Sequence, residues 1–94
     1  MAHWNLAQHY MRQENWRDAQ TAFELAVEAE DDPAQKAYYA GFMILHLYPD
    51  APEKWREART HLERALELRP RYPAAQGLKD PIDLALAVAD DADS

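Results

Sequence analysis

The sequence has 94 residues, of which 48% are hydrophobic and 29% are charged, and its formal net charge at pH 7 is −7. This length fits one small domain, and the acidic balance disfavours binding to nucleic acid or to anionic lipid because both are negatively charged. The absence of cysteine excludes disulfides and thiolate metal sites. No apolar run approaches the roughly 20 residues of a membrane span. We therefore expect a cytoplasmic protein with no membrane partner.

The composition predicts an all-α fold, because helix-forming residues dominate and β-branched ones are scarce. Ala, Leu, Glu, Gln and Arg lose little side-chain freedom in a helix, whereas Val and Ile together occur only four times. From Trp4 on, apolar residues recur at steps of three and four, namely Leu6, Ala7, Tyr10 and Met11. This spacing places them on one face of a first helix.

Two N-cap signals predict the second and third helices. Asn15 can accept from the free backbone N–H groups at a helix start, and Asp18 suits the positive end of the helix dipole. The apolar stripe that follows consists of Ala19, Ala22, Phe23, Ala26 and Val27. Asp32 and Pro33 then predict the cap and first position of a helix over residues 34–48. That helix is apolar nearly all round, so we expect it to lie between two neighbours.

The fourth helix is predicted from a capping box formed by Asp50 and Glu53, and we expect it to extend back to about Ala51. Its apolar positions are Trp55, Ala58, Leu62, Ala65, Leu66 and Leu68. This pattern is typical of a helix with one buried face, and Pro70 ends it.

The last quarter of the chain predicts two shorter helices and an acidic end. A short segment over residues 74–79 comes first, and Asp80 with Pro81 is predicted to cap and start a last helix over residues 82–89. Residues 80–94 contribute −5 to the net charge, and we expect the chain to fray beyond Ala89. We expect the last helix to cap the fold, with its exchange into a neighbouring chain as the alternative.

The sequence contains an internal repeat. The stretches WRDAQTAFELAVE, from Trp16, and WREARTHLERALE, from Trp55, lie 39 residues apart and share seven identical positions. Random pairing would give about one identity. Both tryptophans are candidate binding hot spots, but a large ring is mostly buried on average. We therefore expect both to pack at the start of their helices.

On these positions the chain resembles the tetratricopeptide repeat family, whose unit is a pair of antiparallel helices. A first repeat over residues 2–31 matches the family pattern at Leu6, Ala7, Tyr10, Ala19, Phe23 and Ala26. A second repeat over residues 34–70 matches it at Ala40, Gly41, Ile44, Ala58, Leu62, Ala65 and Pro70. Two residues of the first repeat depart from the family pattern. Trp4 lies one residue after the position of the pattern's Trp, and Pro33 lies two residues after the position of its closing Pro.

The resemblance implies a short right-handed α-solenoid of two helix hairpins with capping helices over residues 72–89. These elements would form one domain over residues 1–90, followed by an acidic tail over residues 90–94. Small residues at matched positions are expected where helices cross closely, first Ala7 and Gly41, then Ala19, Ala26, Ala58 and Ala65.

The resemblance also implies a concave groove for another protein or peptide. Its predicted lining residues are Trp4, Gln8, Met11, Arg12, Tyr38, Phe42, Leu45 and His46. We expect an adaptor or scaffold that binds a peptide or helix there, because aromatic and Met side chains suit apolar anchors. The alternative is a structural protein that assembles with itself as a homo-oligomer. The same rings would then be covered by the capping segment or by a second copy.

Catalysis, cofactors and metals are not expected. No two of the four histidines occur at the i, i+4 spacing that shares a metal on a helix face. The single serine is Ser94 and there is no cysteine, so the usual acyl-transfer nucleophiles are missing. Two glycines are too few for a phosphate-cradling loop.

Overall fold

The computed structural model describes residues 2–92, and in this part of the chain it contains helices and no strand. The helices are α1 (Ala2–Arg12), α2 (Trp16–Ala29), α3 (Pro33–Leu47), α4 (Pro52–Leu68) and α5 (Pro73–Ala92). The predicted all-α fold class is therefore confirmed.

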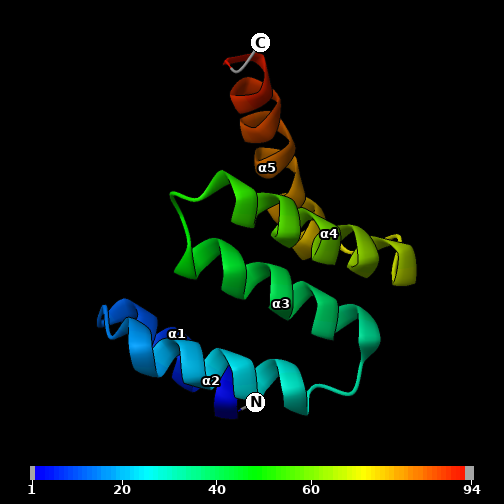
Figure 1. The fold of residues 1–94 in the computed structure, drawn as a ribbon. Coiled ribbons are helices and arrows are strands. Elements are labelled where there is room, and N and C mark those ends of the chain that lie inside the picture. The colour runs from blue at the N-terminus through cyan, green and yellow to red at the C-terminus, as the bar shows by residue number, and fades with distance from the viewer. Residues whose placement is uncertain (1, 93–94) are drawn as a thin grey trace.

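The helices pack mainly against their neighbours in sequence. In Figure 1, α1 and α2 lie together at one end, α3 and α4 follow, and α5 crosses α4 with its C-terminal half rising away from the other helices. Helix α3 contacts α2 on one side and α4 on the other, as predicted for a helix that is apolar nearly all round. The molecule measures 43 × 31 × 17 Å along its principal axes.

Local capping chemistry sets the starts of α2 and α3, as predicted. The Asn15 side chain accepts from the Asp18 backbone N–H at 3.5 Å, and the Asp32 side chain accepts from the Ala34 N–H at 3.1 Å with Pro33 at the first helical position. Glu14 turns the chain between α1 and α2 with a left-handed φ of 60°. The Asn15 N–H then bonds back to the Tyr10 carbonyl at 2.9 Å, which completes a Schellman-type end for α1.

The predicted capping box at α4 is wrong. The helix begins at Pro52, its N-cap is Ala51, and no side chain caps it. Pro52 takes the first helical position and holds the preceding residue in the extended region, at φ −116° and ψ 95° for Ala51. Asp50 therefore lies one residue too early to cap the helix. The predicted backward extension of the helix to about Ala51 agrees with this start.

The predicted break at Asp80 and Pro81 is also wrong, because α5 is one helix that runs through Pro81 to Ala92. Pro81 has no N–H to donate to the carbonyl four residues earlier, which weakens the helix there. Packing compensates, since Ile82 and Leu86 are only 5% and 1% exposed. Asp90 lies within α5 and pairs with Arg56 of α4 at 2.5 Å, so the predicted fraying beyond Ala89 is wrong for residues up to 92.

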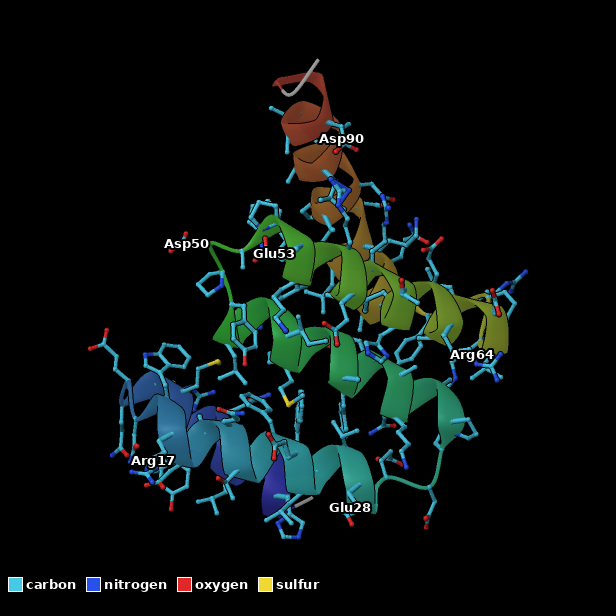
Figure 2. All side chains as sticks on the ribbon, in the orientation of Figure 1. Arg17, Glu28, Asp50, Glu53, Arg64 and Asp90 are labelled. Carbon is cyan, nitrogen blue, oxygen red and sulfur yellow. The ribbon has the colours of Figure 1, made fainter. Side chains whose placement is uncertain are left out.

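Two apolar clusters form the core. The first joins α1 and α2 through Ala7, Ala19, Ala22 and Phe23. The second joins α3, α4 and α5 through Ala37, Ile44, Ala58, Leu62, Ala65, Ala75, Ile82 and Leu86. Charged residues lie outside these clusters, and none is buried among the described residues. The six charged residues labelled in Figure 2 accordingly lie around the edge of the molecule.

The two repeated tryptophans do not share one environment. Trp55 is partly buried and packs against the second cluster, as predicted. Trp16 is 45% exposed, so its predicted packing at the start of α2 is wrong. Trp16 is the first residue of α2 and takes no part in either cluster. The same residue type at matched repeat positions therefore has a structural role in one repeat only.

Close approach between α3 and α4 explains the small residue at Gly41. A Cβ added at Gly41 would lie 2.8 Å from Leu62 Cγ and 3.2 Å from the Ala58 carbonyl oxygen. The side chains of Leu62 and Ala58 are fully buried, as is that of Ala7 in the first hairpin. The predicted burial of small residues at the helix crossings is confirmed at these positions.

We expect Gly41→Ala to destabilise the protein by about 1–3 kcal/mol. The new methyl group would overpack the contact with α4, where the Ala58 backbone carbonyl cannot move aside as a flexible side chain could. Gly77→Ala is the matched control, since a Cβ at Gly77 meets nothing within 4 Å. Within a single chain it should stabilise α5 by about 1 kcal/mol through helix propensity. Urea denaturation of both variants measures the difference. Equal effects of the two changes would contradict the close approach.

Candidate protein-binding surface

Five partly exposed rings from α1, α3 and the segment before α5 form one connected group, which we call the aromatic surface. Its members are Trp4, Tyr38, Phe42, His46 and Tyr72. Four of them belong to the predicted groove. Their ring centroids form a continuous series, with neighbours 4.0 to 6.5 Å apart.

Trp4 connects α1 to α3. Its ring stacks on Tyr39 at a centroid distance of 3.9 Å and an angle of 12°, and it meets Phe42 edge-to-face at 4.8 Å. Below it, the buried ring of Phe23 from α2 lies 5.2 Å away. Such aromatic pairs contribute about 0.5–1.5 kcal/mol each beyond area burial. Rings of α2 and α3 therefore hold Trp4 in place, and the residue remains partly exposed.

The α3 part of the surface follows the helical repeat, because Tyr38, Phe42 and His46 are four residues apart. The His46 ring stacks on Phe42 at 4.0 Å, and its Nδ1 lies 2.9 Å from the Phe42 carbonyl oxygen. A carbonyl oxygen can only accept, so Nδ1 carries the proton in this bond. In the tautomer that this bond selects, Nε2 is the hydrogen-bond acceptor of the ring.

Tyr72 extends the surface beyond the predicted residues. Its ring centroid lies 5.3 Å from that of Tyr38, and the Arg69 guanidinium lies 4.8 Å from its centroid. Burial raises the pKa of both Tyr38 and Tyr72, so both phenols stay protonated and can donate at neutral pH. Tyr72 follows α4 between two prolines, and no periodic pattern marked it as a surface residue.

The other predicted groove residues lie outside the ring contacts. Met11 packs against the first apolar cluster, and Leu45 packs against the second. Gln8 is partly buried on α1, and Arg12 is exposed at the end of that helix. The structure thus brings together four of the eight predicted residues as one group of rings.

An ion pair borders the aromatic surface. The Arg69 guanidinium at the end of α4 donates to the Asp32 carboxylate, which also caps α3. The hydrogen bond from Arg69 holds the pKa of Asp32 below its ordinary value. Because Arg69 also lies over Tyr72, the pair links the start of α3 to the far side of the surface.

A separate hollow of about 260 Å³ lies where α3, α4 and α5 meet. It is lined only by apolar residues, namely Leu45, Pro49, Trp55, Leu78, Pro81, Ile82 and Ala85. Ligand pockets for small molecules usually range from about 300 to 1,000 Å³ and carry a few polar groups that fix the ligand. This hollow is smaller and has no charged lining, so it suits an apolar side chain better than a small molecule.

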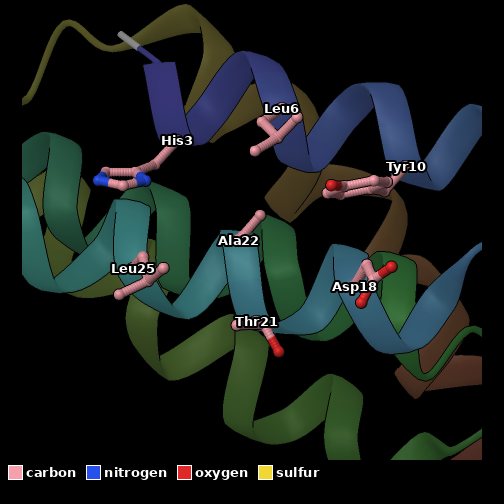
Figure 3. A pocket seen from close by; sticks show the side chains of 7 residues that line it. All are labelled: His3, Leu6, Tyr10, Asp18, Thr21, Ala22 and Leu25. Atoms are coloured by element: carbon pink, nitrogen blue, oxygen red, sulfur yellow. The ribbon is translucent and has the colours of Figure 1, made fainter.

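A second hollow, of about 220 Å³, lies on the outer face of the first hairpin. Figure 3 shows it between α1, which contributes His3, Leu6 and Tyr10, and α2, which contributes Asp18, Thr21, Ala22 and Leu25. Its lining mixes apolar and polar side chains without an unsatisfied buried group. It therefore gives no indication of a particular ligand.

Residues 2–92 contain neither a cluster of metal-ligating side chains nor a helix that could span a membrane. No three His, Asp or Glu side chains in this range come together as a possible metal site. None of its helices combines the length and the apolar character needed to cross a bilayer.

Comparison of the chain with protein-family models, with curated proteins and with solved structures found no match. The resemblance to tetratricopeptide repeats therefore rests on the residues of this chain alone.

The lowered pKa of Asp32 predicts a pH-dependent contribution to stability. The ion pair stabilises the fold above the ordinary carboxyl pKa of 3.8, and this contribution is lost as the pH falls through the lowered folded-state pKa. Asp32→Asn keeps an N-cap but removes the charge, so it should lower Tm at neutral pH and approach the wild type in strong acid.

Asp31→Asn is the control for this comparison, because Asp31 is exposed and takes no part in the ion pairs found among the described residues. Thermal unfolding followed across the acid range measures both variants. A constant difference between Asp32→Asn and the wild type at every pH would show that the charge is not responsible.

Proposed function

We propose that this protein is an interaction module that binds a peptide or helix of another protein across the aromatic surface. The observation that carries the proposal is that five rings from three parts of the chain form one continuous, partly exposed group. Large exposed apolar groups are costly in water, and aromatic residues are enriched where proteins bind each other. The role we propose is binding rather than catalysis, in the cytoplasm.

The helix packing supports a tetratricopeptide-like arrangement. Small buried residues occupy matched crossing positions in the two hairpins, Ala7 in the first and Gly41 in the second. Helix α5 covers α4 as a capping helix would, through Ala75, Ile82 and Leu86. We infer from this packing that the hairpins form a short right-handed solenoid and that the aromatic surface lies on its inner side.

The chemistry of the surface favours a ligand with apolar anchors and few acidic groups. The rings offer flat apolar faces, while the Tyr38 and Tyr72 phenols and His46 Nε2 offer hydrogen bonds at the edges. The net charge of −7 repels acidic partners and attracts basic ones at long range. A segment with bulky apolar side chains flanked by Lys or Arg meets these conditions.

Self-assembly is the second candidate function, and a different observation favours it. Two large apolar residues of α5, Leu84 and Val88, are 69% and 62% exposed. They lie on α5 rather than among the rings. Binding of a partner and self-association therefore use different surfaces and are compatible.

Selection from a displayed random-peptide library tests the proposed function. We expect selected peptides to bind Tyr38→Ala and Phe42→Ala at least about tenfold more weakly than the wild type, because truncation of a central ring removes a hot spot. Fluorescence anisotropy with labelled peptides gives the affinities. Circular dichroism identifies any variant that has lost its fold. If Tyr38→Ala or Phe42→Ala does so, Tyr72→Ala is measured in its place.

Trp16→Ala is the matched control, since it removes an exposed aromatic ring that lies outside the aromatic surface. It should leave peptide affinity unchanged. The proposal is contradicted if no peptide is selected, or if Trp16→Ala weakens binding as much as the ring variants do.

A further inference from the structure

Helix α5 carries two apolar faces, and only one of them is covered. The covered face packs against α4 through Ala75, Ile82 and Leu86. On the other side, residues at steps of four, three and four form a second apolar row, which we call the outer stripe. It consists of Gly77, Pro81, Leu84 and Val88, all of them exposed.

The outer stripe is the most exposed apolar feature of the described chain. Leu84 and Val88 are 69% and 62% exposed, whereas the other exposed large hydrophobic residues reach at most 45%. In the C-terminal half of α5, one face contacts α4 through Leu86 and the Asp90–Arg56 ion pair. The face that carries Leu84 and Val88 is exposed. At the other end of the stripe, a Cβ at Gly77 would meet nothing within 4 Å.

We propose that the outer stripe binds the same stripe of a second copy of this chain, with the two α5 helices antiparallel. The order of side chains makes the stripe complementary to itself. When two stripes run antiparallel about the point midway between Pro81 and Leu84, Gly77 faces Val88 of the second copy. Pro81 then faces Leu84 of that copy. A residue without a side chain opposite a branched one allows the helices to approach closely.

Charge selects the antiparallel orientation. Residues 90–94 carry −3, so parallel helices would bring two acidic ends together. In the antiparallel pair this end lies beside the segment that precedes α5 in the second copy, which contains Arg69 and Arg71. Arg71 is exposed and belongs to none of the ion pairs found among residues 2–92. The opposed helix dipoles favour the same orientation.

The competing site on a second copy is the hollow on the outer face of the first hairpin, where Leu6 and Leu25 are exposed. Contact between that hollow and α5 would join unlike surfaces and produce open chains of increasing length. The antiparallel α5 pair joins like surfaces about a two-fold axis and stops at two copies. The size of the assembly therefore distinguishes the two arrangements.

Sedimentation equilibrium at micromolar concentrations tests the pairing. We expect the wild type to have twice the mass of the 10.9 kDa chain, and Leu84→Glu and Val88→Glu to sediment as single chains. Both side chains are exposed, so the variants should keep the wild-type circular dichroism. Leu25→Glu, which places the same charge in the competing hollow, should remain a dimer.

Engineered cysteines test the orientation, because the chain has no cysteine of its own. In the double variant Gly77→Cys with Val88→Cys, the antiparallel pair predicts disulfides between position 77 of one copy and position 88 of the other. The two positions are roughly 16 Å apart along one helix, too far for a bond within a chain. Mass spectrometry of the digested covalent dimer identifies the linkage.

Three outcomes would overturn the inference. A wild type that sediments as a single chain rejects the pairing. An open series of larger species that Leu25→Glu abolishes shows instead that the outer stripe binds the hollow on the first hairpin of the next copy. Disulfides between identical positions reject the antiparallel orientation. These results leave peptide binding untouched, because Leu84→Glu should bind selected peptides as the wild type does.

Discussion

The fold depends on the short distance between α3 and α4, which a glycine allows. With no side chain at Gly41, the Leu62 side chain and the Ala58 backbone occupy the space that a Cβ would need. Helix α3 is thereby held against α4 on one side while α2 packs on its other side. Because α3 lies in the middle of the molecule, its position decides where its side chains emerge at the surface.

The aromatic surface follows from that position. Tyr38 and Phe42 emerge from α3 between Trp4 of α1 and Tyr72 beyond α4, so that three segments of chain contribute to one group of rings. Neighbouring buried rings, Phe23 and Tyr39, hold Trp4 in place. A ligand that binds these rings meets side chains that are already ordered, which reduces the conformational entropy that binding costs.

Most features determined by nearby residues were predictable from the sequence, although the cap predicted at Asp50 is wrong. Features determined by distant packing were not predictable. The caps at Asn15 and Asp32 act within three residues, and the buried small residues repeat with the helical period. Pro81 was predicted to start a helix, but the packing of its neighbours on α4 keeps it inside α5. Tyr72 joins the aromatic surface only because α4 returns beside α3. Four of the groove residues that the resemblance implied belong to that surface, Trp4 on α1 and Tyr38, Phe42 and His46 on α3.

The most direct test of the central claim is an NMR titration of the protein with a selected peptide, followed through the indole N–H signals of its three tryptophans. We expect the Trp4 signal to shift in proportion to the bound fraction, because Trp4 lies among the rings that we propose contact the peptide. The signal of exposed Trp16 should stay in place. A shift of Trp16 alone, or binding that moves neither signal, would contradict the account.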